Sequence, residues 1–375
     1  MTMPADPPPD PIAAVTHPDP YPYYERLVRE RPFHFDARLN LWVAASAAAV
    51  EAVLTSDLCR VRPPAEPVPR HLGTGMAAAV FGRLVRQTEG PERDRRKRLL
   101  QAALAAIPAE QVAAATRERL RALRGLPPDD LLFALPVQAM ARLLGLTDRL
   151  DETAMQLALL VRSFLPQADS AAMADGDAAA KALLARLRAA GGLAQDGLMR
   201  HLRGDDVMLA NALGLLVQTH DATAALLGNA LLALARQPVL HRQLAARPDL
   251  LPAFVQEAMR HDAPVQNTRR FAAADGTLCG QAVPAGAAVL VLLAAANRDP
   301  AANTEPHRFL IERRQRRLFG FGHGSHRCAG PDIAATIAAT AIAEMIATAT
   351  FPVTDVTALR YRPSSNARIP IFARS

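Results

Sequence analysis

The residue best placed to do chemistry is Cys328, which lies in a glycine-rich stretch over residues 321–330. Glycines allow tight turns in which backbone N–H groups point at a sulfur atom, and Pro331 suits the first turn of a following helix. Backbone N–H groups, a helix N-terminus and a bound metal all favour the charged thiolate. An isolated cysteine in such a turn is more often simply buried. The whole stretch nevertheless indicates a functional thiolate.

Composition narrows the class of partner. The chain has 43 lysines and arginines against 36 aspartates and glutamates, a net charge of +7, which favours an acidic partner. We expect no nucleic-acid partner, because there is no nucleic-acid motif and the 5% of aromatic residues is poor for base stacking. Three widely spaced cysteines suit a reducing compartment better than a disulfide framework.

The chain shows no clear targeting or membrane segment. Residues 1–22 are rich in proline and aspartate and lack the features of a signal peptide. No uncharged apolar run reaches about 18 residues, because polar side chains interrupt the best candidate, residues 209–235. We therefore expect a cytoplasmic protein with no membrane partner. No linker or repeat divides the chain, so residues 1–18 are expected to be a flexible leader and residues 19–375 a single domain.

Hydrophobic periodicity predicts a mainly α fold with a smaller β region. Short strands are expected within 33–45, within 265–292 and in the tail, and a loop over 300–317. The expected helices cover residues 19–31, 47–54, 91–106, 109–123, 129–145, 151–164, 176–190, 205–236, 250–261 and 331–349.

The stretch around Cys328 fits the pattern F-G-x-G-x-H-x-C-x-G and resembles the haem-binding loop of the cytochrome P450 family. The resemblance implies the cytochrome P450 fold, with haem b between the long central helix and the helix after the cysteine loop. It makes Cys328 the ligand of the haem iron. It also implies basic partners for the haem propionates: Arg270 or His326, and Arg93 and Lys97, which stand where the family usually has H-x-x-x-R. The implied cofactor-binding residues are Cys328, His326, Arg270, Arg93, Lys97, Phe321, Gly322 and Gly330.

Two charged features gain an interpretation from the same resemblance. Glu257 and Arg260, three residues apart, are on their own typical of a surface ion pair. In the family, an E-x-x-R helix is followed by a P-x-R-F segment, which implies a buried triad with Arg308. The arginine-rich stretch 312–317, including Arg313 and Arg316, is expected to steer an acidic ferredoxin, although such runs are usually just solvated.

The long helix departs from the family pattern at the stretch that resembles its oxygen-activation site. Asp221 stands in the place of the usual acid, but Ala222 replaces the usual threonine. Gln218 lies one turn earlier on the same face, whereas Thr223 lies about 100° further round and is expected to be a poor substitute. Three interpretations stay open: a substrate hydroxyl or water replaces the threonine, Gln218 or Thr219 organises the water, or the chemistry is less standard. These four catalytic candidates are Asp221, Gln218, Ala222 and Thr223.

The resemblance implies a haem-thiolate monooxygenase that oxidises a hydrophobic small molecule with O₂ and electrons from an acidic ferredoxin and its reductase. One alternative is a peroxide-using or non-hydroxylating haem-thiolate enzyme, such as a desaturase, cyclase or isomerase. Another is a non-catalytic haem sensor. Substrate contacts are expected from residues 63–88, 164–166, 213–221, 264–267 and 366–369.

Overall fold

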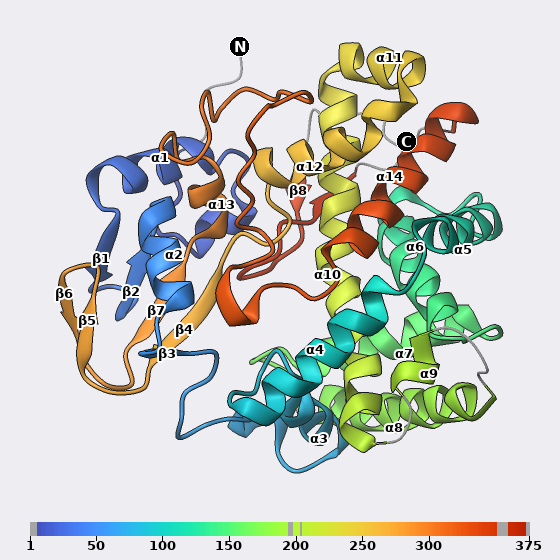
Figure 1. Cartoon of the computed structure of the whole chain (residues 1–375), viewed down its shortest axis with the longest axis horizontal. Helices are drawn as coiled ribbons and strands as arrows, with labels where there is room; N and C mark the ends of the chain where they lie inside the picture. The colour runs from blue at the N-terminus through green and yellow to red at the C-terminus, as the bar shows by residue number, and fades with distance from the viewer. Residues whose placement is uncertain (1–5, 194–197, 203–204, 351–358, 373–375) are drawn as a thin grey trace.

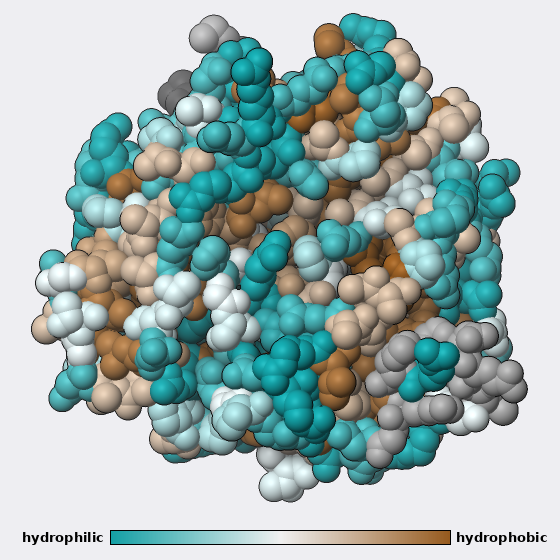
Figure 2. Space-filling view, viewed as in Figure 1, coloured by the Kyte–Doolittle hydropathy of each residue, from teal (hydrophilic) through white to brown (hydrophobic). Residues whose placement is uncertain are grey.

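A computed structural model describes residues 6–193, 198–202, 205–350 and 359–372. Helices fill one side of the molecule and a small mixed sheet lies on the other, with the long helix α10 (Asp206–Arg236) between them (Figure 1). Hydrophilic side chains cover much of the face in Figure 2, and apolar side chains show in patches between them. The expected mainly α fold with a smaller β region is confirmed.

Helix α10 is the axis of the helical side. Asp205 caps it by accepting a hydrogen bond of 2.6 Å from the backbone N–H of Met208. Its buried residues lie all round the helix, which is typical of a helix enclosed by others. Helices α6 and α12 pack directly against it, and α5 packs against α14. The helices of this side are α3 (Met76–Arg83), α4 (Pro91–Ala105), α5 (Ala109–Ala122), α6 (Pro128–Leu143), α7 (Leu150–Ser163), α8 (Ser170–Leu193), α9 (Leu198–Leu202), α11 (Pro238–Ala246), α12 (Leu251–His261) and α14 (Pro331–Ala347).

Most expected helices are present within a few residues of their expected ends. Helix α8 is longer than its predicted span of 176–190, and α3, α9 and α11 were not expected. No single helix of the described ranges is long and apolar enough to cross a membrane. Two bent pairs, α4 with α5 and α10 with α11, pass the same test of length and composition only together.

The sheet joins strands from opposite ends of the chain. Its order is β1-β2-β7-β4-β3, and β2 pairs in parallel with β7, with Trp42 opposite Val289. The strands are β1 (Phe33–Asp36), β2 (Leu41–Ala44), β3 (Cys59–Arg60), β4 (Thr268–Ala272) and β7 (Ala288–Val291), with separate pairs β5 (Gly276–Leu278) and β6 (Gln281–Val283), and β8 (Arg360–Tyr361) and β9 (Pro370–Ile371). Helices α1 (Tyr21–Glu30), α2 (Ala47–Thr55) and α13 (Leu293–Asn297) complete this side.

The described part of the expected flexible leader is folded. Residues 13–16 form a 3₁₀ turn in which Val15 is fully buried. Arg368, near the other end of the chain, donates hydrogen bonds to the carbonyls of Val15 (2.9 Å) and His17 (2.7 Å) and pairs with Asp262 at 2.8 Å. These contacts hold residues 15 and 17 in place, which the proline-rich composition did not indicate. Residues 1–5 of the expected leader over residues 1–18 lie outside the described residues, so the leader stays a prediction there.

The loop before α14 rests on a buried carboxylate. Glu257, on α12, is fully buried and pairs with Arg260 at 2.7 Å, with Arg316 at 2.9 Å and with Arg313 at 3.2 Å. It also accepts a hydrogen bond of 3.0 Å from the backbone N–H of Leu310. One carboxylate thus binds three guanidinium groups.

The predicted triad of Glu257, Arg260 and Arg308 is therefore corrected. The Arg308 side chain is exposed and pairs with Glu305, and only its backbone carbonyl takes part, by accepting a hydrogen bond of 2.9 Å from Arg260. Arg313 and Arg316 fill the place expected for Arg308, so neither is free to steer a partner protein. A segment without periodicity gave no means of choosing between these arginines from the sequence.

Burial alone would raise the pKa of Glu257, but hydrogen bonds from Arg260, from the Leu310 amide and from Arg313 lower it to about 2. The carboxylate is therefore ionised in the folded protein at pH values where the unfolded chain is already protonated. Its contribution to stability is complete above pH about 4.5 and is lost as the pH falls through about 2.

We expect the substitution Glu257→Gln to lower the free energy of unfolding by about 3–5 kcal/mol at neutral pH, because it leaves buried guanidinium groups without their anion. The matched control is Glu305→Gln, which breaks an exposed Glu–Arg pair of the same spacing and should cost less than about 1 kcal/mol. Urea unfolding at several pH values measures both variants. An equal effect of the two substitutions, or a Glu257→Gln effect that does not shrink below pH 4.5, would contradict this account.

Candidate functional site

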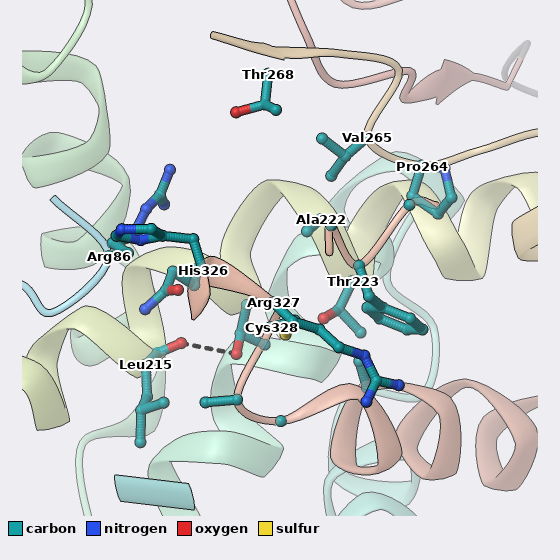
Figure 3. Close-up of a pocket in the computed structure, with 18 of the residues that line it drawn as sticks. Arg86, Leu215, Ala222, Thr223, Pro264, Val265, Thr268, His326, Arg327 and Cys328 are labelled. Atoms are coloured by element: carbon teal, nitrogen blue, oxygen red, sulfur yellow. Dashed lines mark hydrogen bonds between the residues drawn. The ribbon is translucent and has the colours of Figure 1, made fainter. Parts of the chain in front are cut away.

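A cavity of about 450 Å³ lies between α10 and the loop that precedes α14. Side chains from α4, α10, β4, α14 and this loop line it, so segments far apart in the chain meet at one site (Figure 3). Its walls are largely apolar near α10, with Leu215, Leu226 and Val265 among them. Basic side chains also line it, as described below.

Cys328 lies at this cavity with its sulfur open to it (Figure 3). Its backbone N–H donates a hydrogen bond of 2.8 Å to the carbonyl of Phe321, which closes the glycine-rich loop. Gly322 and Gly324 have φ angles of +71° and +66°, which only glycine adopts without strain. Burial raises the pKa of the Cys328 thiol, whereas the Gly330 N–H and nearby cations, Lys97 first, lower it.

Helix α4 and the segment before it hold the loop in place. Lys97 donates hydrogen bonds to the carbonyls of Ser325 and Arg327, the second at 2.6 Å. His326 lies 2.9 Å from a carboxylate oxygen of Glu89. Burial, followed by the charge of Arg93, lowers the pKa of Lys97 to about 8. The loop is thus fixed by side chains more than 200 residues away in the sequence.

The structure separates the predicted cofactor-binding residues. Seven of the eight line the cavity: Lys97, Arg270, Phe321, Gly322, His326, Cys328 and Gly330. The eighth, Arg93, does not. It is buried beside the cavity, where it donates a hydrogen bond of 3.2 Å to the carbonyl of Val85 and pairs with Asp94. The i,i+4 spacing places Arg93 and Lys97 on one side of α4, but only Lys97 lines the cavity.

One stripe of α10 faces the cavity. Its members are spaced i, i+3, i+4, i+7, i+8 and i+11, as expected for one side of a helix. They are Leu215, Gln218, Thr219, Ala222, Thr223 and Leu226. Asp221 falls outside the stripe, and its carboxylate lies 2.7 Å from Nδ1 of its neighbour His220. The expected catalytic acid is therefore not part of the cavity wall.

The polar groups of the stripe differ in whether their hydrogen bonds are already made. Thr219 donates 2.8 Å to the carbonyl of Leu215, shown as the dashed line in Figure 3, and Gln218 donates 2.9 Å to the carbonyl of Gly214. Within the described residues, the Thr223 hydroxyl has no protein partner, although Thr223 is 2% exposed. The stripe is wide enough to include both Ala222 and Thr223, so Thr223 lines the cavity despite its position about 100° further round the helix.

Four arginines of the cavity wall were not among the predicted site residues: Arg62, Arg86, Arg269 and Arg327. Arg62 and Arg86 both line the cavity, from the region between β3 and α4. The expected substrate-contact range 63–88 contains Arg86 but did not single it out. The only sequence signal for Arg86 is that a cationic residue follows the apolar Val85. Other expected contacts, residues 164–166 and 366–369, are absent from the described lining.

The comparisons point to one family. The model of the family "Cytochrome P450" matches residues 201–358. The chain is 38% identical over 161 residues to 20-oxo-5-O-mycaminosyltylactone 23-monooxygenase of Streptomyces fradiae, covering 42% of this chain and 38% of that protein. That relative and several others are thus matched over less than two thirds of their length. Protein DesVIII of Streptomyces venezuelae is 34% identical over 322 residues, covering 81% of this chain and 73% of the relative.

The fold agrees over nearly the whole chain. The crystal structure of CalO2 superposes with a TM-score of 0.83 and 26% identity, covering 97% of this chain and 98% of that one. The likeness therefore includes the regions outside residues 201–358, where sequence patterns are weakest.

We expect Gly324→Ala to destabilise the loop more than Gly322→Ala. Both positions have positive φ, so each substitution carries a backbone cost of about 1–2 kcal/mol. A β-carbon at Gly324 would in addition lie 2.9 Å from the carbonyl oxygen of Leu54, whereas one at Gly322 meets nothing closer than 3.8 Å. Unfolding in urea gives the two free energies. Equal losses would show that the contact with α2 does not hold the loop.

Proposed function

This chain belongs to the cytochrome P450 family, and we propose that it is a haem-thiolate monooxygenase that oxidises a hydrophobic small molecule. Its cofactor is haem, iron protoporphyrin IX, as the family and the matched structures imply. The observation that carries the proposal is the Cys328 sulfur, open to a cavity whose opposite wall is the α10 stripe. The activity in the name of the Streptomyces fradiae relative, a monooxygenase, supports the same reaction class.

The donor set of the cavity fits haem. A thiol that can ionise suits the iron, and basic side chains suit two propionate groups. We assign the iron to Cys328 and the propionates to Arg270, Lys97 and His326, which line the cavity near the loop. The Arg270 guanidinium is buried, and its single hydrogen bond in the described structure goes to the neighbouring carbonyl of Arg269 at 2.8 Å. A buried cation with donors to spare is suited to an anionic ligand.

When bound, haem supplies the activation of O₂ that allows oxidation of C–H bonds. The protein's own residues first exclude water, because the apolar side chains of the α10 stripe and Val265 favour an apolar substrate over solvent. Their second contribution is proton delivery. We assign this role to the Thr223 hydroxyl, which can hold a water or pass a proton within the cavity in place of the hydroxyl that Ala222 lacks.

We propose that electrons come from an acidic ferredoxin and its reductase. The net charge of +7 supports an acidic partner. The docking residues must differ from those expected, since Arg313 and Arg316 are occupied by Glu257. Arg314 of the same stretch is exposed, and so is Arg98, next to the loop-binding Lys97 on α4. These two arginines are our candidates for the contact.

A second candidate function is a haem-thiolate enzyme that uses peroxide and needs no electron donor. Ala222 favours it. Hydrogen peroxide brings its O–O bond and its protons together, so this route depends less on the proton delivery to which the usual threonine contributes. The experiment below separates the two.

We expect the purified holoprotein, reduced in the presence of carbon monoxide, to show the absorption typical of thiolate-ligated haem, and the substitution Cys328→Ser to abolish it. The control is Cys279→Ser, since Cys279 is exposed and outside the cavity. Identical spectra for wild type and Cys328→Ser would refute the ligand assignment. Incubation of a panel of apolar probes under ¹⁸O₂ with NADPH, ferredoxin and reductase should give labelled products. Equal turnover with hydrogen peroxide alone would favour the second candidate.

We expect Thr223→Val to lower the product formed per NADPH roughly tenfold or more and to raise the release of hydrogen peroxide, because proton transfer by a positioned group contributes 10²-fold or more. The double substitution Ala222→Thr with Thr223→Val should restore part of the coupling. Thr219→Val is the comparison, because its hydroxyl is already bonded to Leu215. A larger loss in Thr219→Val than in Thr223→Val would transfer the role to Thr219. No loss in either would assign proton delivery to substrate or water.

A further inference from the structure

The cavity wall carries an unbalanced positive charge. Among the described lining residues there is no aspartate or glutamate, whereas the arginines and lysines number six: Arg62, Arg86, Lys97, Arg269, Arg270 and Arg327. Haem brings two propionates and the thiolate brings one further negative charge. The wall still carries more positive charge than these groups neutralise, so it suits an additional anion.

Most of these cations already have a hydrogen-bond partner or an assigned role. Lys97 is bonded to two carbonyls of the loop, and Arg270 is assigned to a propionate. Arg62 donates 3.0 Å to the carbonyl of Glu66 and lies 3.9 Å from its carboxylate. Arg269 and Arg327 are exposed, and so is Arg86, which lines the cavity. The protein around Arg86 nevertheless desolvates its guanidinium.

Arg86 is our candidate for binding this additional anion. Within the described residues, its guanidinium has no hydrogen-bond partner and no acidic neighbour. Burial lowers the pKa of Arg86, although the nearby Cys328 raises it, and the group stays charged in any case. A desolvated cation without an anion is suited to a ligand that brings one.

The backbone that carries Arg86 is held firmly. The N–H of Val85 donates 2.9 Å to Asn211 of α10, and the Val85 carbonyl accepts 3.2 Å from Arg93 of α4. Asn211 in turn donates 2.9 Å to the carbonyl of Arg83. The residue just before Arg86 is thus fixed to two helices, and Arg86 itself lines the cavity (Figure 3). A pre-positioned cation gives more affinity than one on a mobile loop.

We propose that the substrate is an apolar molecule that carries a carboxylate, and that Arg86 pairs with this carboxylate inside the cavity. The inference rests on the proposed function, because it names the substrate class of the same site. The apolar stripe of α10 and Val265 would hold the rest of the molecule. The carboxylate at Arg86 then fixes which carbon faces the reacting centre, so this arginine determines both selectivity and position.

The experiment compares each of two acids with its uncharged analogue: dodecanoic acid with dodecanamide, and 4-phenylbutanoic acid with 4-phenylbutanamide. Binding to the holoprotein is measured by isothermal titration calorimetry and by the shift of the haem spectrum. For wild type we expect the acids to bind about tenfold or more tightly than the amides, the lower range for a charge-assisted hydrogen bond. Arg86→Gln should reduce this ratio to roughly one, and Arg86→Lys should retain part of it.

The matched control is Arg83→Gln, which removes an exposed arginine three residues away and outside the cavity wall. It should leave the ratio of acid to amide affinity unchanged. Equal binding of acids and amides to wild type would overturn the proposal. So would an Arg86→Gln variant that keeps the ratio but loses haem or shifts its reduction potential, since Arg86 would then serve a propionate.

Failure of the proposed function can be distinguished from failure of the carboxylate proposal. If the carbon-monoxide spectrum shows no thiolate ligation, the monooxygenase assignment falls, while calorimetry still reports whether Arg86 selects an acid over its amide. If the spectrum is typical but calorimetry shows no selection, only the carboxylate proposal falls.

Discussion

A single buried carboxylate organises the irregular backbone on which the haem loop rests. Glu257 attracts Arg260, Arg313 and Arg316, and the remaining N–H groups of these arginines donate to backbone carbonyls, including those of Pro306, Thr304 and Ile311. Residues 300–323 contain neither helix nor strand, so their polar backbone groups need partners from outside regular structure. Three guanidinium groups supply many of them, and the carboxylate keeps those groups in place.

The use of arginine explains how one glutamate and its partners can supply hydrogen bonds to many backbone carbonyls. A guanidinium has five N–H donors in a fixed plane, so one side chain can bind a carboxylate and several carbonyls at once. Lysine has a single compact charge and appears at the haem loop only as Lys97, which binds two carbonyls. The same residue type serves a different end at Arg86, where donors are left free for a ligand. What separates the two uses is whether an acidic neighbour is present.

The sequence was sufficient for what depends on local pattern. The periodicity of residues 205–236 predicts α10 within one residue at its start, and the pattern around Cys328 predicts the cofactor. Contacts between segments far apart in the chain could not be predicted from the sequence. Asp221 and Thr223 are two residues apart, yet one faces His220 and the other the cavity, and only the packing of α10 decides which. Arg308, Arg313 and Arg316 are similar residues in one unpatterned segment, and Arg86 has no motif.

The pairing of β2 with β7 has a consequence for how the chain is made. On the ribosome, β2 emerges about 250 residues before its parallel partner β7. The edge of β2 that pairs with β7 therefore stays unpaired while the helical side is synthesised. Sheets that join distant segments form slowly and expose apolar edges meanwhile. The helical side can condense around α10 as it emerges, but the sheet closes only when translation is nearly finished. Trp42 and Val43 therefore stay without their parallel partners, Val289 and Leu290, until late in synthesis.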